Sequence, residues 1–515
     1  MLLDLLAETW TAVSATRSRN AKRDLLAATL AAAEPGDLEI AVSYLAGALR
    51  QRRPGLGWRG LAALPDPAAE ASLTLRQVDA TFEAMAGLSG SGSANRRSAL
   101  AADLFGRATE REQAFLRGLV LGDLRQGAMD ALVQEGMARA FGVDPAVVRR
   151  AAMLLSSTPE AALVLATGGA EALAAVGLTV GTPIQPMLAA SAPGPEAALL
   201  KSGVPAIADV KLDGIRVQVH RRGQDVWVFT RSLDEITERL PEVVAAVRTI
   251  AAEELVLDGE VLALLPDGRP EAFQLVASRT ATRSSGPEQR LTLQVFFFDV
   301  LSVDGRTLLD AGLTERAAEL ERLLPPELRV ERTTVTTVEE LTDVFDSAVA
   351  RGFEGVVVKQ PDAGYVAGRR QASWIKVKPR HTLDLLVTGV EWGYGRREGW
   401  LSNIHLAARD AATGEPVMLG KTFKGMTDEL LRWQTEHFEA IATSRDQHTV
   451  HVRPTTVVEI ACDGLQQSTR YPGGVALRFA RVLRYRPDKN AAEADTLDDV
   501  KRLLGPPVDG PDERD

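Results

Sequence analysis

The chain has 515 residues, of which 45% are hydrophobic and 25% are charged. This length predicts about three domains, and ordinary glycine and proline contents exclude the collagenous, fibrous and disordered classes. The formal net charge is −10, with 69 Asp and Glu against 59 Lys and Arg, which argues against attachment to nucleic acid through bulk charge. Half of this excess lies in residues 487–515, which hold nine acids and four bases.

Cysteine content and targeting signals restrict the class further. Cys462 is the only cysteine, so the chain can form neither an internal disulfide nor a zinc site of four cysteines or of two cysteines and two histidines. We expect Cys462 to be a buried, small hydrophobic residue. The first residues do not resemble a signal peptide, and no uncharged apolar run reaches the roughly 20 residues that cross a bilayer. We therefore expect a cytoplasmic protein without membrane contact.

Residues 1–182 are predicted to form an all-helical domain. One helix face is predicted from the spacing of Leu2, Leu3, Leu6, Trp10 and Val13, and Asp144 before Pro145 is typical of a helix start. Residues 87–93 are rich in glycine and serine, which predicts a flexible surface loop. Near residues 181–186 the helical spacing of apolar residues changes to the alternation of apolar and polar residues that is typical of strands, and we place a domain boundary there.

Residues 183–380 are predicted to be an α+β domain. Ile215, Val217 and Val219 alternate with polar residues, and a turn at 222–225 leads to a second strand at 226–229, which predicts a β-hairpin. Further strands are predicted at 255–257, 291–298, 355–359 and 374–378. Helices are predicted at 241–250, 315–324 and 338–351.

Residues 381–500 are predicted to form a small β-barrel of the OB-fold type, followed by an acidic tail at 501–515. The predicted strands cover 387–390, 403–408, 417–420, 457–461 and 477–484, with one helix at 427–442. The predicted fold class is therefore multi-domain α+β, with a helical domain, an α+β domain and a C-terminal barrel.

An ordered series of short motifs carries the chemistry. A lysine such as Lys211, in Lys-Leu-Asp-Gly, is a nucleophile only when its amine is neutral, and this motif alone more often marks a surface lysine. Five further motifs follow in order: Leu-Asp-Gly-Glu (257–260), Phe-Phe-Phe-Asp (296–299), Phe-Glu-Gly-Val-Val-Val-Lys (353–359), Trp-Ile-Lys-Val-Lys-Pro (374–379) and Arg-Tyr-Arg-Pro-Asp-Lys (484–489). The ordered series is far more specific than any single motif.

This series resembles the motifs of the covalent nucleotidyltransferase superfamily of DNA ligases and mRNA capping enzymes, over residues 183–489. Leu-Gly-Asp-Leu-Arg-Gln-Gly (121–127) resembles the helical DNA-binding domain of archaeal-type ATP-dependent DNA ligases, and bacterial ligase B is the closest type we can suggest. The resemblance implies a DNA-binding domain at 1–182, an adenylation domain at 183–380 and an OB-fold at 381–500.

The resemblance also implies an activity. A member of this family uses ATP and Mg²⁺ to seal nicks with 5′-phosphate and 3′-hydroxyl ends in double-stranded DNA, through a lysine–AMP intermediate and an adenylated DNA end. The expected setting is DNA replication, repair or recombination. We expect a monomer that binds nicked duplex DNA, and no protein partner can be identified.

The family assigns roles to the motif residues. Lys211 is expected to attack the α-phosphorus of ATP, with Asp213 as a further catalytic residue, and Glu260 and Glu354 to be ligands of Mg²⁺ or contacts to the ribose. The C-terminal motif is expected to close over the triphosphate and orient the leaving pyrophosphate through Arg486, Asp488 and Lys489. The other expected nucleotide contacts are Asp209, Arg216, Arg231, Phe298, Arg370, Lys376 and Lys378.

Some of these residues have a plainer interpretation. A glutamate at a strand end is more often a solvated acid, and Lys376 with Lys378 could simply form a cationic sheet face. Three adjacent phenylalanines cannot all face one side of a strand, so at least one of residues 296–298 is expected in the core. Asp209 stands where many family members have glutamate, which weakens the expected bond to adenine.

Four alternative functions differ from an ATP-dependent DNA ligase. An NAD-dependent ligase would be expected to carry a four-cysteine zinc module, which Cys462 alone cannot form. A capping enzyme would not need a long helical domain before the nucleophile. An RNA ligase stays open, because the sequence does not show how the sugar is discriminated. A non-catalytic nucleic-acid scaffold is disfavoured by the intact motif series.

Overall fold

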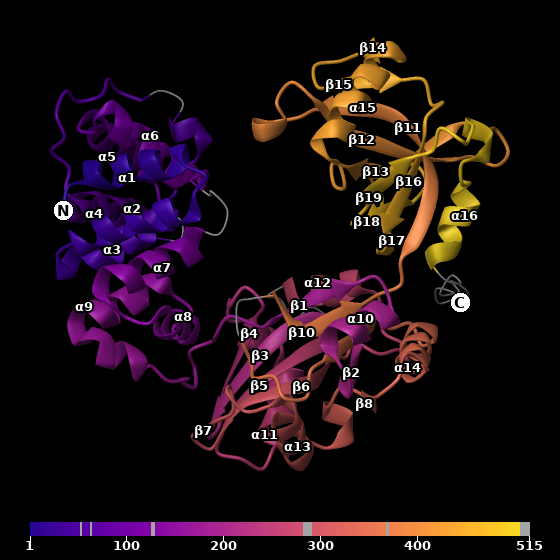
Figure 1. Cartoon of the computed structure of the whole chain (residues 1–515), viewed down its shortest axis with the longest axis horizontal. Coiled ribbons are helices and arrows are strands. Elements are labelled where there is room, and N and C mark those ends of the chain that lie inside the picture. Colours follow the sequence, from indigo (N-terminus) through magenta and orange to yellow (C-terminus); the bar gives the residue numbers. More distant parts are fainter. Residues whose placement is uncertain (52–53, 62–63, 125–128, 282–290, 367–369, 505–515) are drawn as a thin grey trace. The chain divides into compact units, whose positions relative to one another are not determined.

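The structure, a computed structural model, describes residues 1–51, 54–61, 64–124, 129–281, 291–366 and 370–504 (Figure 1). The chain folds into two compact units, each assembled from separate stretches of sequence. The first contains Met1–Ala190, Leu212–Arg332 and Lys359–Trp374. The second contains Ser191–Lys211, Thr333–Val358 and the chain from Ile375 on.

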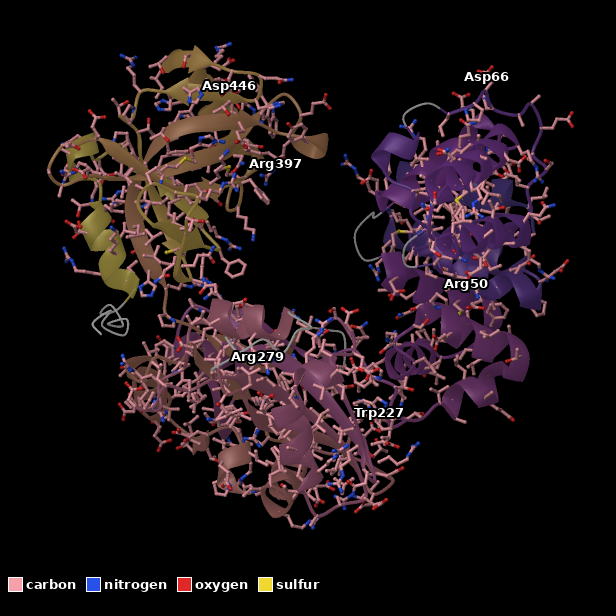
Figure 2. All side chains as sticks on the ribbon, turned by 180° about the vertical axis from the view of Figure 1, so that it is seen from behind. Arg50, Asp66, Trp227, Arg279, Arg397 and Asp446 are labelled. Carbon is pink, nitrogen blue, oxygen red and sulfur yellow. The ribbon has the colours of Figure 1, made fainter. Side chains whose placement is uncertain are left out.

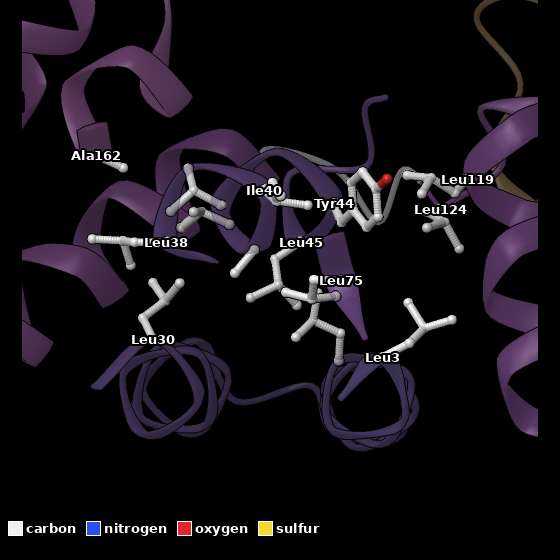
Figure 3. Close-up of a cluster of buried hydrophobic side chains, with 14 of the residues drawn as sticks. Leu3, Leu30, Leu38, Ile40, Tyr44, Leu45, Leu75, Leu119, Leu124 and Ala162 are labelled. Carbon is white, nitrogen blue, oxygen red and sulfur yellow. The ribbon is translucent and has the colours of Figure 1, made fainter. Parts of the chain in front are cut away.

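The first unit begins with helices. Their bounds are α1 Leu3–Ala15, α2 Arg19–Ala31, α3 Pro35–Leu45, η1 Trp58–Leu61, α4 Leu75–Ala86, α5 Ser93–Gly106, α6 Glu110–Leu121, α7 Met129–Phe141, α8 Pro145–Leu154 and α9 Thr158–Ala174. Leu3, Leu30, Leu38 and Tyr44 belong to one shared core (Figure 3). The predicted start of α8 is confirmed, since the Asp144 carboxylate accepts the Ala146 N–H at 2.7 Å.

Within the described ranges, no single helix is long and apolar enough to cross a membrane, and only the bent pair α8 and α9 passes that test when joined.

The first unit also contains an antiparallel sheet with the strand order β4-β3-β5-β6-β7. The bounds are β3 Ile215–Arg222, β4 Asp225–Thr230, β5 Glu254–Leu262, β6 Gln294–Val303 and β7 Arg306–Thr307. The predicted hairpin is confirmed, because Arg222 pairs with Asp225 across the turn from β3 to β4. The surrounding helices are η2 Thr237–Arg239, α11 Pro241–Arg248, α12 Phe273–Ala281, α13 Leu313–Leu323 and η3 Pro326–Leu328. Helix α13 packs against β6, and α11 against β4 and β6.

A second sheet has the order β1-β10-β9-β2-β8 and carries Lys211 at the end of β2. Its strands are β1 Leu188–Ala192, β2 Ala206–Lys211, β8 Arg332–Val335, β9 Gly355–Lys359 and β10 Arg370–Val377. Two helices, α10 Pro195–Ser202 and α14 Val338–Ala350, pack on each other, and α14 packs on β2. Strand β2 is buried from Ala206 to Val210 and becomes partly exposed only at Lys211, which predisposes this lysine to chemistry at a surface.

The C-terminal region is strand-rich and consistent with the predicted OB-fold. Its elements are β11 His381–Trp392, η4 Gly395–Arg397, β12 Leu401–Arg409, β13 Pro416–Thr422, α15 Asp428–Ala440, β14 Ala442–Arg445, β15 Thr449–Val452, β16 Val457–Cys462, β17 Gly464–Gln467, β18 Val475–Arg478, β19 Arg481–Tyr485, η5 Ala491–Glu493, α16 Leu497–Lys501 and η6 Arg502–Leu504. Strand β11 pairs with β12, β15 and β16, so it is the central strand of the largest sheet in this region. Cys462 is buried in this core, as expected.

Two strand predictions in this region differ from the structure. The strand predicted at 387–390 is the centre of the longer β11, whose buried residues Leu385 and Leu386 are adjacent and therefore break the alternation that sequence reading depends on. The single strand predicted at 477–484 is two strands, β18 and β19. Phe479 lies between them with a φ of +53°, which interrupts regular extended backbone.

Candidate active site

Lys211 and two other motif residues form a charged cluster in the second unit. The Lys211 ammonium pairs with one carboxylate oxygen of Glu354, and Lys378 pairs with the other. Lys378 also reaches Asp463 at 3.3 Å. The backbone N–H of Glu354 donates to the Lys211 carbonyl at 3.0 Å, which ties the start of β9 to the end of β2. Residues of three separate motifs therefore meet at one carboxylate.

The ionisation of this cluster follows from its burial and its charges. Burial alone would raise the pKa of Glu354, but attraction and hydrogen bonds from Lys211 and Lys378 outweigh burial and hold that pKa below its ordinary value. Burial alone would lower the pKa of Lys378, whereas Glu354 and Asp463 raise it above its ordinary value. Glu354 is therefore an anion and Lys378 a cation at neutral pH.

Gly355 permits the approach that builds this cluster. Its φ is +127°, and a Cβ atom there would lie 2.2 Å from the Val377 carbonyl oxygen. No other residue fits so close to β10 without moving the backbone. The short distance between the Glu354 and Lys378 side chains thus depends on a glycine next to the glutamate.

Two other predicted contacts lie in the same unit. Asp209 is buried on β2, two residues before Lys211, so the two side chains point to the same face of the strand. Lys376 and Lys378 are both partly exposed, whereas Val377 between them is fully buried. This pattern agrees with the prediction that the two lysines share a face.

In the first unit, Arg216 belongs to a buried polar network. Its Nε and Nη2 donate to the two oxygens of Asp258 at 3.0 and 2.7 Å, and its Nη1 donates to the Met187 carbonyl at 2.7 Å. The Tyr365 hydroxyl donates to Asp258 at 2.7 Å and accepts the Met187 N–H at 3.0 Å. Burial raises the pKa of Tyr365, so its hydroxyl keeps the proton that it donates. The bidentate ion pair holds Arg216 in one orientation.

Aromatic rings and cations gather beside this network. Phe298 and Trp374 pack edge to face with centroids 5.9 Å apart. The Lys359 Nζ lies 4.9 Å from the Phe298 ring centroid and 4.1 Å from that of Trp374, and the Arg216 guanidinium lies 5.5 Å from Phe298. Phe297 is fully buried in the core of the sheet. It is therefore a core residue, as expected for at least one of the three phenylalanines, and Phe298 keeps a partly exposed ring.

Glu260 supports the loop formed by the last residues of the nucleophile motif. Its Oε1 accepts the Gly214 N–H at 3.3 Å, and a Cβ at Gly214 would lie 2.3 Å from the Val261 carbonyl oxygen. Asp213 is partly exposed in the same loop, and Arg231 is exposed just after β4. The side chain of Arg370 and residues 125–127 of the N-terminal motif lie outside the described residues.

The C-terminal motif forms a second charged cluster. The Nε and Nη2 of Arg486 donate to Asp488 at 2.9 and 2.7 Å, and its Nη1 donates to Asp384 at 3.1 Å. The Lys489 Nζ donates to the same Asp384 oxygen at 2.6 Å. The hydrogen bond from Arg486 lowers the pKa of Asp488 to about 2. Asp384 thus joins two motif residues that lie more than a hundred positions further along the chain.

The metal-binding prediction rests on Glu260 and Glu354. Among the described residues, no group of three or more His, Cys, Asp or Glu could hold a metal ion. The two ammonium groups at Glu354 oppose a cation at that carboxylate in this arrangement. Mg²⁺ often takes only one or two protein carboxylates and completes its shell with water and substrate phosphates. Taken separately, each glutamate offers carboxylate oxygens of the kind that a Mg²⁺ ion arriving with a nucleotide would take.

Several residues of these clusters have no role assigned from the sequence. Asp258, Lys359 and Trp374 lie inside the quoted motifs, so their position was a usable signal. Asp384 is an acid inside the apolar run of β11, which hints at a buried ionic partner. Tyr365 has no local signal, because its partners Met187 and Asp258 lie far from it in sequence.

Comparisons with known proteins agree with one another. A family model described as ATP dependent DNA ligase domain matches residues 186–378, one described as ATP dependent DNA ligase C terminal region matches 397–489, and one described as DNA ligase N terminus matches 63–138. A "Probable DNA ligase" of Beutenbergia cavernae is 60% identical over 513 residues, covering 98% of this chain and 100% of the relative. Another, from a Nocardioides species, is 58% identical over 511 residues, with 98% and 99% covered.

Among solved structures, one described as "Pmar-Lig_PreS3" superposes with a TM-score of 0.63 at 20% sequence identity, covering 93% of this chain and 99% of that chain. At this identity the similarity shows the fold alone.

Proposed function

Because the chain belongs to the family of ATP-dependent DNA ligases, we propose that Lys211 is the residue that carries AMP during its reaction. The protein is an enzyme that seals nicks in DNA by forming phosphodiester bonds, with ATP as cosubstrate. The single observation that supports Lys211 is its place at the partly exposed end of a buried strand, where it pairs with Glu354 of a second motif and Lys378 of a third motif pairs with the same carboxylate.

The proposed reaction has three displacements at phosphorus. The Lys211 Nζ, after losing a proton, bonds to the α-phosphorus of ATP, and the bond to pyrophosphate breaks. An oxygen of the DNA 5′-phosphate then attacks the same phosphorus and releases the lysine. Finally the 3′-hydroxyl attacks the 5′-phosphate, and AMP leaves. Before the first step, Lys211 has to exchange its ion pair with Glu354 for contact with the nucleotide.

The other motif residues are proposed to bind and orient the nucleotide. We propose that Phe298 stacks on the purine and that Arg216, held by Asp258, orients this ring and contacts the nucleotide. Glu260 and Glu354 would hold Mg²⁺, which supplies positive charge against the charge that develops on phosphate. Further proposed roles are catalysis by Asp213, an adenine contact by Asp209, and nucleotide or phosphate contacts by Arg231, Arg370, Lys376 and Lys378.

The domain roles are also proposals. Residues 1–182 would bind the DNA duplex, 183–380 would carry out adenylation, 381–500 would form the OB-fold, and 501–515 would be an acidic tail. The match of the DNA ligase N terminus model to 63–138 supports the first role. We further propose a monomeric, cytoplasmic enzyme of DNA replication, repair or recombination without membrane contact.

Labelling with nucleotides tests the proposed function. The chain is incubated with α-labelled ATP, α-labelled GTP or adenylate-labelled NAD, and denaturing electrophoresis follows. ATP should leave an acid-labile adduct on the chain, and Lys211→Arg, which keeps the charge but not the nucleophilicity, should leave none. An adduct on the Lys211→Arg variant would remove Lys211 from its role, and comparable labelling by NAD would contradict the use of ATP.

A further inference from the structure

Asp384 is the point where two cations of the C-terminal motif, Arg486 and Lys489, meet. Its Oδ2 accepts Arg486 at 3.1 Å and Lys489 at 2.6 Å. Two cations this close repel each other, and the repulsion is offset by the carboxylate between them. Asp384, a residue of β11 that no motif includes, is therefore the one carboxylate that holds Arg486 and Lys489 together, while Glu459 lies 3.7 Å from Arg486 alone.

Asp384 is itself held firmly. Its backbone N–H donates to the Asp495 carboxylate at 2.8 Å, and its carbonyl accepts the Asp495 N–H at 2.8 Å. Within β11 it pairs with Glu459 of β16. The carboxylate thus projects from a rigid strand that is bonded on both sides, and a residue on such an element can fix the geometry of its partners.

Arg486 is hydrogen-bonded to the carboxylates of Asp384 and Asp488, and its Nη1 also lies 3.7 Å from a carboxylate oxygen of Glu459. The two hydrogen-bonded carboxylates differ in burial. The side chain of Asp384 is 13% exposed, whereas that of Asp488 is 57% exposed. Asp384 takes the Nη1 of the guanidinium, and Asp488 takes the edge formed by Nε and Nη2. Water and an incoming anion therefore reach the side of Arg486 that faces the exposed Asp488 before they reach the side that faces Asp384. The edge of Arg486 that is bound by Asp488 is therefore the one that an anion can take over.

We propose that Asp384 is a positioning residue for the transfer of AMP to Lys211: it anchors Arg486 and Lys489 as a pair, so that the Nε and Nη2 edge of Arg486 passes from Asp488 to the leaving pyrophosphate. This inference rests on the role toward pyrophosphate that the family resemblance implies for Arg486 and Lys489 and that we also propose for this chain. It adds a residue that is required for that role and does not touch the nucleotide.

The test compares the first and third steps of the reaction in the full-length chain. Asp384→Asn keeps the size of the side chain and one acceptor oxygen but removes the charge. Its maximal single-turnover rate of Lys211 adenylation with α-labelled ATP should fall by about 10- to 100-fold, the loss expected from misplaced transition-state contacts. The third step, measured on nicked DNA that already carries AMP, should keep its rate, because no pyrophosphate is present.

Two further variants separate positioning from stability. Asp384→Glu keeps the charge and should recover most of the first-step rate. Asp446→Asn is a matched control in the same region, since the Asp446 carboxylate pairs with His451 at 2.9 Å and is exposed (Figure 2). This control should leave both steps unchanged. In a chain that already carries Arg486→Ala and Lys489→Ala, Asp384→Asn should cause no further loss of the first step.

Each outcome decides between the inference and its premise. If Arg486→Ala slows the first step and Asp384→Asn does not, the inference is wrong and the role of Arg486 stands. If Arg486→Ala and Lys489→Ala both leave the first step intact, the proposed role of the motif fails. Equal losses of both steps in Asp384→Asn, or a further loss in the chain without Arg486 and Lys489, would show a structural role and overturn the inference.

Discussion

His220 is buried inside the first unit, where its Nδ1 accepts the Gly181 N–H at 3.0 Å and its Nε2 lies 2.9 Å from the Gln218 side-chain oxygen. Since Nδ1 is an acceptor, Nε2 carries the hydrogen and the ring is neutral. Burial lowers the pKa of His220 to about 3, whereas an unfolded histidine titrates near 6.5. The unfolded chain therefore binds the extra proton between these two pH values, and the folded chain does not.

This difference predicts a loss of stability in acid. The contribution of His220 is complete above about pH 6.5 and declines as pH falls toward 3, by roughly 1.4 kcal/mol for each pH unit. Between pH 7 and pH 5, the free energy of unfolding in urea should therefore fall by about 2 kcal/mol more in the wild-type chain than in His220→Asn. The same pH dependence in both chains would show that His220 titrates normally.

Strand β9 is the element on which the charged cluster at Lys211 depends, because it begins at Gly355 directly after Glu354. Gly355→Ala would place a methyl group against the Val377 carbonyl and force a side chain into a φ of +127°. We expect a loss of about 1–3 kcal/mol or more in the free energy of unfolding. Adenylation of Lys211 should also fall, because Glu354 and Lys378 would no longer be held close enough to form their ion pair.

A glycine elsewhere in the chain serves as the matched control for this element. Gly177 has no atom within 4 Å of the position where its Cβ would lie. Gly177→Ala should therefore leave both the thermal midpoint and adenylation near wild type. If Gly355→Ala were as harmless as Gly177→Ala, β9 and β10 would not be constrained by this contact.

At the scale of the whole molecule, the proposed domains divide chemistry from DNA binding. A chain that begins after Gly181 keeps Lys211, Glu354 and Lys378 and should still form the lysine–AMP adduct. It should seal nicks poorly, because the phosphate contacts proposed for residues 1–182 are gone. A plot of the logarithm of affinity against the logarithm of salt concentration has a negative slope, and each lost phosphate contact should reduce the magnitude of this slope by about 0.9.

Binding of nicked DNA across a salt series, for the full-length and shortened chains, checks this division. If the shortened chain kept the same affinity and the same salt slope, DNA binding would have to be assigned to residues 182–515. Loss of the adduct together with sealing would instead show that the helical residues are needed for the chemistry.

The sequence by itself determined the family, the order of the domains and the residues of each motif. Motifs are readable because side chains with related roles stand at short spacings along the chain, and the roles proposed for Lys211 with Asp213 and for Arg486 with Lys489 follow this pattern. Local rules were also sufficient for the hairpin of β3 and β4 and for the Asp144 cap, since both depend on residues next to each other in the chain.

Only the tertiary structure decided which of those residues meet. Glu354 binds two lysines from other motifs, Asp384 binds Arg486 from 102 positions away, and Tyr365 closes a network with Asp258. The structure also decided that Phe297 enters the core, because that choice depends on the face of β6 that the sheet buries. Contacts between distant segments are set by packing and charge in the folded chain, and local spacing does not say which partner each residue meets.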